Sequence, residues 1–279
     1  MLVTLKEILK IAEAKKCAIG SFNAPNLTSL KAIIAAAEER NEPVIIMHAQ
    51  VHEEMGLCKM DEMGPIILFM ADRAKVPVCV HLDHGTDLDY IKRGLEIGFT
   101  SVMFDGSELG NDLNFAHTEI AVALAYETGA SVEAEIGSMG ARESGASGGS
   151  DESIYTDPDM AKKFVEETGI DALACAFGTA HGLYLKQPKL DFDRLAKIKS
   201  MINVPIVMHG GSGVSHEDYR KVIDLGVRKI NYYSYMAKAG GTAAAAVEDK
   251  TFFHDIEVAA IEGIKKDVLD AMKVFSMES

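Results

Sequence analysis

The chain has 279 residues, of which 48% are hydrophobic and 25% are charged, and its formal net charge is −14 at pH 7. This is an ordinary globular composition, and so negative a chain is repelled by nucleic acid and by anionic membrane surfaces. No apolar segment is long enough to cross a membrane, and residues 1–16 resemble an amphipathic helix rather than a signal peptide. The four cysteines include no CxxC pair and fit a reducing compartment. We therefore expect a cytoplasmic protein without nucleic-acid or membrane partners.

Short apolar or β-branched segments alternate with segments of helical period along the whole chain. The expected strands are residues 18–22, 43–47, 77–82, 101–104, 131–135, 171–176, 205–208 and 227–231. The expected helices are residues 30–40, 62–75, 88–98, 115–128, 158–168, 193–200, 217–225, 235–247 and 258–272. This alternation predicts a parallel α/β protein.

Two architectures fit the alternation, a closed (β/α)8 barrel and an open doubly wound sheet. Near-continuous apolar strands are typical of a sheet covered on both faces, and polar residues gather after the strands, where the active sites of barrels lie. We therefore expect one (β/α)8 TIM-barrel domain over residues 1–279 with a C-terminal helical tail. The glycine- and serine-rich segment near residues 137–156 follows the fifth strand, and we expect it to be a mobile loop over the active-site face.

Three histidines each end a short apolar segment and stand close to a glycine. His84, His181 and His209 follow the expected third, sixth and seventh strands, and these loops converge on one mouth of a barrel. Three neutral imidazoles bind Zn²⁺ and leave a coordination position open for substrate. Each histidine alone would more simply be a hydrogen-bonded residue at the rim of the sheet. The repetition favours a catalytic metal site.

The other histidines lack this pattern. His48 ends the second strand without a glycine, and we expect it in the wall of the pocket. His81 stands just before the metal-binding pair and is expected to support it from behind. The remaining four are expected at the surface: His52, His117, His216 and His254.

Carboxylates accompany the three histidines. Asp83 directly precedes His84, so its carboxylate is expected beside the metal, where it can move a proton. Asp105 ends the fourth strand and Glu135 the fifth, and together they could hold a second cation. Glu133 shares a strand face with Glu135 and is expected to support the site or to form an ion pair.

A glycine-rich segment at residues 210–213 follows the seventh strand, and Asn231 and Ser234 follow the eighth. In barrels, the loops after these two strands frequently bind phosphate through backbone N–H groups and helix N-termini. Glycine-rich segments more often mark turns, but this one begins directly after His209. That position favours a phosphate site.

These segments together resemble the class II, metal-dependent ketose-bisphosphate aldolases. In family order they are SFNA (21–24), HLDHG (81–85), SVMFDGS (101–107), SVEAEIG (131–137), YTDP (155–158), GTAHG (178–182), MHGGSG (208–213) and KIN (229–231). The resemblance implies a dimeric or tetrameric (β/α)8 barrel. It also implies reversible cleavage of a ketose 1-phosphate or ketose bisphosphate, such as fructose 1,6-bisphosphate or tagatose 1,6-bisphosphate. The products would be dihydroxyacetone phosphate and an aldehyde, formed through a zinc-stabilised enediolate.

The resemblance implies roles for individual residues as well. His84, His181 and His209 would bind the catalytic Zn²⁺, and Asp105 and Glu135 would hold a second or displaced divalent ion. The family commonly also uses a monovalent cation, Na⁺ or K⁺.

Two carboxylates would move protons in such an enzyme. Asp83 would take the proton of the C4 hydroxyl in cleavage, and Glu143, in the glycine-rich loop, would exchange the proton at C3 of dihydroxyacetone phosphate. The implied substrate-binding residues are Asn23, Gly182, Gly210, Gly211, Ser212, Asn231 and Ser234.

Three positions depart from the family pattern where the acceptor aldehyde would sit. Tyr233 replaces a small or acidic residue and would contact the substrate, Ala49 replaces a serine or threonine, and Arg142 interrupts the glycines of the loop. Such changes are either neutral or mark another acceptor, from a tagatose bisphosphate, a deoxy-sugar acid phosphate or another ketose 1-phosphate. Arg142 would then pair with an acidic group at the far end of the aldehyde.

Other functions remain open from the residues alone. A Schiff-base aldolase needs a strand-borne lysine; the sixth strand has none, and Lys229 is the one candidate left for that route. A metal-dependent sugar-phosphate isomerase or epimerase would use a similar barrel, and a sugar-phosphate-binding regulator would need only the binding site. The adjacent Asp83 and His84 together with Glu143 favour bond cleavage.

Overall fold

The structure, a computed structural model, describes residues 1–137, 155–184 and 186–278. Eight parallel strands pair in chain order and the eighth pairs with the first, so the sheet closes into a barrel. The strands are β1 (Ile19–Asn23), β2 (Val44–Ala49), β3 (Val78–Gly85), β4 (Ser101–Phe104), β5 (Ser131–Ile136), β6 (Ala172–Cys175), β7 (Ile206–Met208) and β8 (Val227–Tyr232). The predicted (β/α)8 barrel is confirmed, and the open doubly wound sheet is excluded.

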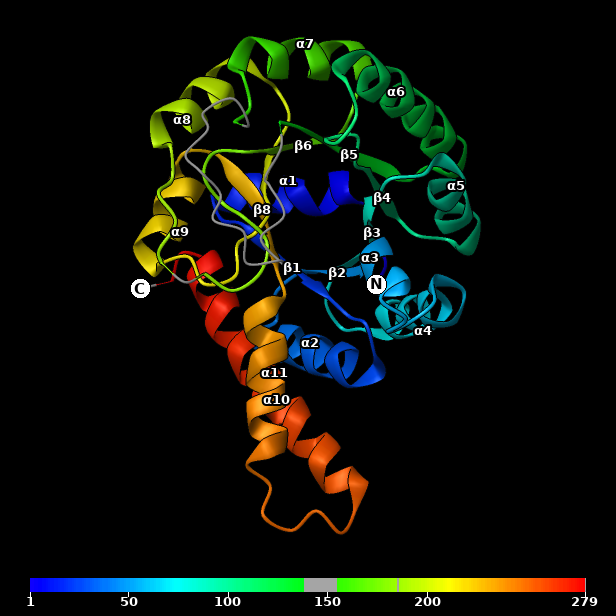
Figure 1. Ribbon diagram of the computed structural model, residues 1–279, viewed down its shortest axis with the longest axis vertical. Helices are drawn as coiled ribbons and strands as arrows, with labels where there is room; N and C mark the ends of the chain where they lie inside the picture. The colour runs from blue at the N-terminus through cyan, green and yellow to red at the C-terminus, as the bar shows by residue number, and fades with distance from the viewer. Residues whose placement is uncertain (138–154, 185, 279) are drawn as a thin grey trace.

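Helices surround the barrel and bury the outer faces of the strands (Figure 1). They are α2 (Leu27–Arg40), α4 (Met60–Arg73), α5 (Leu88–Ile97), α6 (Asn111–Thr128), α7 (Pro158–Thr168), α8 (Phe192–Met201), α9 (His216–Asp224) and α10 (Ser234–Ala245). A five-residue helix, α3 (Gln50–Glu54), directly follows β2 and was not predicted. It is too short to carry a helical period that a sequence pattern could reveal.

The N-terminal helix α1 (Leu5–Lys15) closes one end of the barrel. It begins at a capping box in which Thr4 and Glu7 bond each other's backbone N–H groups. The backbone N–H of Lys6 donates to Ser131, the first residue of β5. The apolar face of α1 packs into a cluster with inward-facing strand residues such as Ile45 and Val207. Because α1 covers the start of the strands, the opposite end of the barrel remains for the site.

The last two helices form a hairpin that projects from the barrel (Figure 1). Helix α11 (Phe253–Phe275) packs along α10. Their close contact depends on small residues, since a Cβ on Gly263 would lie 2.6 Å from that of Ala243. Among the described residues, no helix is long and apolar enough to cross a membrane. The predicted loop near residues 137–156 falls largely on residues 138–154, which lie outside the described part of the chain together with Arg142 and Glu143.

Candidate metal centre and active site

Asp83 and His84 enter the same pocket because β3 is irregular at its end. In a regular strand, adjacent side chains point to opposite faces of the sheet. Here Leu82 pairs with Val102 but Gly85 pairs with Phe104, so β3 has one more residue than β4 over this stretch. His84 takes the left-handed conformation, with φ of +50°. Such a bulge redirects a side chain at a functional site, and both residues line one pocket.

The three predicted ligand histidines converge. The ring centroid of His84 lies 4.9 Å from that of His181 and 4.6 Å from that of His209. One ligand nitrogen from each ring lies within 4.8 Å of the others. The approach of the β6 and β7 loops requires glycine at position 210, where φ is +60° and a Cβ would lie 2.4 Å from the carbonyl oxygen of Ala180. The geometry fits one shared cation.

Carboxylates orient two of these rings. Nδ1 of His84 lies 2.6 Å from Oδ2 of Asp105, and Nε2 of His209 lies 2.8 Å from Oε1 of Glu133. The remaining nitrogens, Nε2 of His84 and Nδ1 of His209, are buried and have no hydrogen-bond partner among the described residues. A ring held by a carboxylate on one side with its other nitrogen unused is the usual state of a metal-binding histidine. The residues therefore fit a divalent metal ion.

The charges around the rings also favour a bound cation. Burial opposes a charge on His84, but Asp83, Asp105 and Glu135 outweigh it and raise its pKa to about 10. Burial and the neighbouring His84 lower the pKa of His181 to about 3. Carboxylates concentrated around His84 therefore attract a positive charge, which a metal ion can supply once it displaces the proton.

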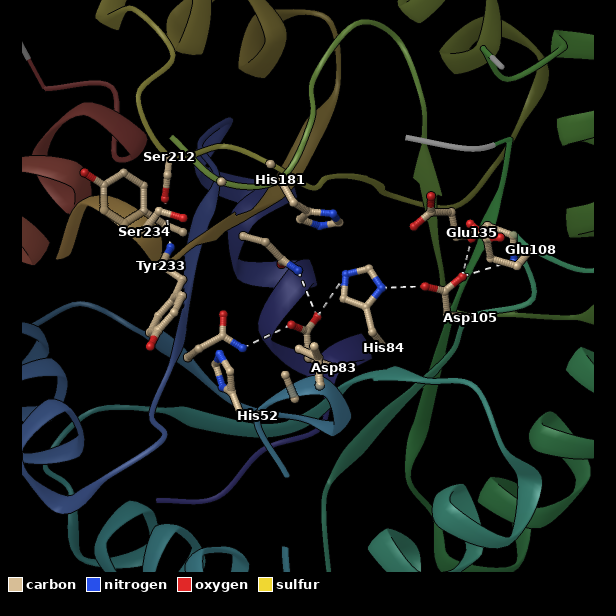
Figure 2. Close-up of a pocket in the computed structure, with 18 residues that line it drawn as sticks. His52, Asp83, His84, Asp105, Glu108, Glu135, His181, Ser212, Tyr233 and Ser234 are labelled. Atoms are coloured by element: carbon tan, nitrogen blue, oxygen red, sulfur yellow. Dashed lines mark hydrogen bonds and ion pairs between the residues drawn. The ribbon is translucent and has the colours of Figure 1, made fainter. Parts of the chain in front are cut away.

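A second group of possible ligands shares His84. It consists of His84, Asp105 and Glu135, and Figure 2 shows the two carboxylates together on one side of the pocket. Burial and the charge of Asp105 raise the pKa of Glu135 well above its ordinary value. Oε2 of Glu135, which is buried and without a hydrogen-bond partner among the described residues, lies 3.5 Å from Nδ1 of His209. These carboxylates can hold a second or displaced cation.

Two amide side chains fix the carboxylate of Asp83. Nδ2 of Asn23 donates to its Oδ2 at 3.1 Å, and Nδ2 of Asn231 donates to its Oδ1 at 3.0 Å. The amide of Asn231 is itself oriented, because its Oδ1 accepts from Nζ of Lys229 at 2.7 Å. Burial opposes ionisation of Asp83, but the charges of His84 and Lys229 lower its pKa below the ordinary range. Asp83 is thus an ionised carboxylate with a set orientation.

A buried ion pair supports the centre from inside the barrel. Nζ of Lys229 lies 2.9 Å from Oε2 of Glu133, and both side chains are fully buried. Oε1 of the same glutamate orients His209. His81, predicted to support the site from behind, is fully buried next to Glu133 and bonds Ser101 at 2.8 Å. Lys229 does not line the pocket, so the geometry gives no support to a Schiff base there.

The other end of the pocket presents glycines, serine hydroxyls and the start of a helix, which are groups suited to an anion. Gly182, Gly210, Ser212 and Ser234 line it, and α10 begins at Ser234 without a side-chain cap. The N-terminus of such a helix attracts anions through its free N–H groups and its dipole. Gly211 differs from expectation: it does not line the pocket, and its N–H donates to the carbonyl oxygen of Asn231 at 3.0 Å.

Tyr184 was missed by sequence reasoning and joins the two loops of this end. Its hydroxyl accepts from the backbone N–H of Ala180 at 2.8 Å and donates to the carbonyl oxygen of Gly210 at 2.9 Å. No pattern in the sequence distinguishes this tyrosine, since its partners are backbone atoms of two separate loops.

The pocket itself encloses about 270 Å³. Ala49 and Tyr233, which were expected on the acceptor side, both line it, and Glu108 lines it near Glu135 (Figure 2). Glu108, like Val51 in the same lining, carried no signal in the sequence.

Two histidines lie elsewhere than the sequence predicts. His52, predicted at the surface, is 5% exposed and lines the pocket. His48, predicted in the pocket wall, is 1% exposed and lies outside the barrel, where its ring contacts Phe99. Strand alternation explains the correction, because Met47 takes the inward position and sends the next side chain outward.

Comparisons with known proteins identify the family of the chain. A family model described as fructose-bisphosphate aldolase class II matches residues 3–279. A protein of Halalkalibacterium halodurans named 6-phospho-5-dehydro-2-deoxy-D-gluconate aldolase is 38% identical over 98% of this chain and 96% of its own length. The protein YdjI of Escherichia coli is 35% identical over 96% of this chain and 95% of its own.

Solved structures show the same likeness. The crystal structure of the YdjI aldolase from Escherichia coli K12 has a TM-score of 0.88 and 34% identity, and the match covers 99% of this chain and 97% of that one. A putative fructose-1,6-bisphosphate aldolase of Coccidioides immitis has a TM-score of 0.86 and 28% identity, with 97% and 95% covered. From the family match along nearly its whole length, the chain belongs to the class II fructose-bisphosphate aldolase family.

Proposed function

We propose that this protein is a metal-dependent aldolase that reversibly cleaves a ketose 1-phosphate or ketose bisphosphate into dihydroxyacetone phosphate and an aldehyde. The observation that carries the proposal is the convergence of His84, His181 and His209 beside the fixed carboxylate of Asp83. The pocket then continues to an end lined by glycines and serines at the start of α10. A cation, a base and an anion site in one pocket are what cleavage of a phosphorylated ketose requires.

The phosphate of the substrate would bind at the glycine and serine end. The open N-terminus of α10 and the hydroxyls of Ser212 and Ser234 offer hydrogen bonds to phosphate oxygens. Binding energy from this remote group fixes the donor half of the sugar for the reaction.

Asp83 would act as the base in cleavage. Its low pKa keeps it ionised, and Asn23 and Asn231 hold both oxygens in place. It would accept the proton of the C4 hydroxyl as the C3–C4 bond breaks, and would return that proton in the condensation direction.

The metal ion that we propose is Zn²⁺, held by His84, His181 and His209. A divalent ion there acts as a Lewis acid toward the negative charge that develops on the donor half. Asp105 and Glu135 would hold a second or displaced divalent ion, and the enzyme would also use a monovalent cation, Na⁺ or K⁺. These assignments rest on the ligand set and on the family.

Two proposed roles concern residues outside the described part of the chain. Glu143 would exchange the proton at C3 of dihydroxyacetone phosphate, and Arg142 would pair with an acidic acceptor. We further propose that the protein acts in the cytoplasm as a homodimer or homotetramer.

The test is a panel of phosphorylated ketoses. Fructose 1-phosphate, fructose 1,6-bisphosphate, tagatose 1,6-bisphosphate and a deoxy-sugar acid phosphate are each incubated with the enzyme, with and without EDTA. The last belongs in the panel because one relative is named for such a substrate. Dihydroxyacetone phosphate is measured through a coupled dehydrogenase, and we expect its release from at least one sugar, abolished by EDTA. A change of substrate without any triose would support an isomerase or epimerase instead.

A further inference from the structure

A short segment after β2 places an unassigned imidazole in the pocket. His52 lies on α3, is 5% exposed, and packs against the ring of Tyr233 with 4.7 Å between the ring centroids. Figure 2 shows the two side chains together, on the side of Asp83 opposite Asp105 and Glu135. The pair therefore faces the reacting region from the side away from the acidic cluster.

The two rings come from different parts of the barrel. Tyr233 follows β8, and its backbone N–H donates to Oγ of Ser212 at 2.9 Å, so its backbone belongs to the anion-binding end. Its side chain extends from there to His52. Ala49, which pairs with Asp83 across β2 and β3, is a small residue that lines the same pocket as His52 and Tyr233.

A second observation shows that α3 is held firmly in place. Glu53, the residue after His52, accepts from the backbone N–H of Met60 and from the hydroxyl of Tyr90, both at 2.9 Å, and pairs with Arg93 at 3.1 Å. Burial raises the pKa of Glu53, but these bonds outweigh it and lower the pKa below its ordinary value. One carboxylate thus ties α3 to the start of α4 and to α5.

The network continues behind the helix. Because the hydroxyl of Tyr90 donates to Glu53, it must accept from Nε2 of His48, which lies 3.0 Å away. Burial lowers the pKa of His48 to about 4, so its ring is neutral and Nδ1 is an acceptor. The thiol of Cys58 lies 3.8 Å from that nitrogen and donates to it. This chain of bonds gives α3 more support than its five residues provide alone.

We propose that His52 and Tyr233 form the surface that recognises the acceptor aldehyde, and that Glu53 is the positioning residue that holds His52 there. The inference rests on the proposed function and names its substrate class, a polyhydroxylated aldehyde. Aromatic rings pack against the C–H groups of such a chain, while the imidazole N–H and the phenol hydroxyl bond its hydroxyls.

Two measurements separate this role from the rest of the reaction. The first is kcat/KM for cleavage of the best ketose phosphate. The second is the exchange of the C3 proton of dihydroxyacetone phosphate with D₂O, which uses the donor half alone and needs no aldehyde. His52→Ala is expected to lower kcat/KM for cleavage about tenfold, the size of one lost hydrogen bond, mainly through KM. It should leave C3 exchange within twofold of wild type.

The positioning role has its own test. Glu53→Ala should raise KM for cleavage as His52→Ala does, while Glu53→Gln should restore most of the loss, because its carbonyl oxygen still accepts from Met60 and Tyr90. Met55→Ala is the matched control, since Met55 directly follows α3 and is 61% exposed; it should change neither reaction.

The outcomes are distinguishable. Wild-type enzyme that neither cleaves any ketose phosphate nor exchanges the C3 proton would contradict the proposed function itself. Wild-type enzyme that does both, together with a His52→Ala variant that loses both equally or neither, would overturn the recognition role alone. A Glu53→Ala variant with wild-type KM would overturn the positioning role.

Discussion

The buried ion pair inside the barrel allows a sharp prediction about stability. Lys229, Glu133 and His209 are all fully buried, and Nζ of Lys229 lies 2.9 Å from Glu133. Burial raises the pKa of Glu133, but Lys229 and His209 outweigh it and lower the pKa to about 2. Lys229→Met would remove the main compensating charge and leave a buried carboxylate without its cation.

Breaking one side of a buried pair costs about 3–5 kcal/mol. One kcal/mol shifts Tm by about 2 °C or more for a chain of this size, so Lys229→Met should lower Tm by about 6 °C or more. The assay is thermal unfolding followed by circular dichroism in metal-saturated buffer. As a control, Lys92→Met removes an exposed pair with Glu96 and should cost less than about 1 kcal/mol.

The double variant Lys229→Met with Glu133→Gln tests the cause. A neutral amide at position 133 can still accept from His209, and it no longer needs a cation, so the double variant should recover much of the lost Tm. A single variant within 2 °C of wild type, or a double variant no more stable than the single one, would refute the reasoning.

Three further variants test the site. Asp83→Asn should lower kcat for cleavage by about 100- to 10,000-fold, the usual contribution of a general base; a loss below tenfold would argue against Asp83 as the base. Asp105→Ala removes the acceptor of the 2.6 Å bond that orients His84 and should weaken metal binding by about 10- to 100-fold in competition with a chelator, whereas unchanged affinity would remove its orienting role. Gly210→Ala would bring a Cβ to 2.4 Å from the carbonyl oxygen of Ala180 and should raise KM and lower Tm. Gly241→Ala meets open space in α10 and should do neither.

The third strand shows what the sequence can and cannot predict. The apolar segment 77–82 was predicted as a strand, and Asp83 and His84 were placed at the mouth from their position after it. The structure continues the strand to Gly85 through a bulge. A sequence pattern can show that a strand ends in polar residues. It cannot show that a bulge in the strand directs two adjacent side chains into the same pocket.

The histidines in and directly after the second strand show a different limit. The expectation for His48 and His52 came from distance along the chain, without the direction of each side chain. Alternation sends His48 outward, and the unpredicted helix α3 returns the chain so that His52 faces the pocket. The packing of α3 depends on contacts of its Glu53 with Tyr90 and Arg93 of α5, and only the folded barrel brings the two helices together.

Lys229 shows a third limit. Its sequence position allowed a Schiff-base role, because a lysine in an apolar strand has no evident partner. Its partners Glu133 and Asn231 come from β5 and β8, and the closure of the barrel brings the carboxylate to it. The ligand histidines could be predicted from the sequence because each carries its own local pattern, a glycine next to a histidine that follows a short apolar segment.

The most direct measurement is a metal titration of enzyme freed of metal by a chelator. Zn²⁺ is added stepwise, bound metal is counted by mass spectrometry, and release of dihydroxyacetone phosphate from the preferred ketose phosphate is followed at each step. A site of three histidines predicts no activity without metal and a rise that saturates at about one ion per chain. Full activity in the metal-free enzyme would contradict the central claim that these three histidines hold the ion on which cleavage depends.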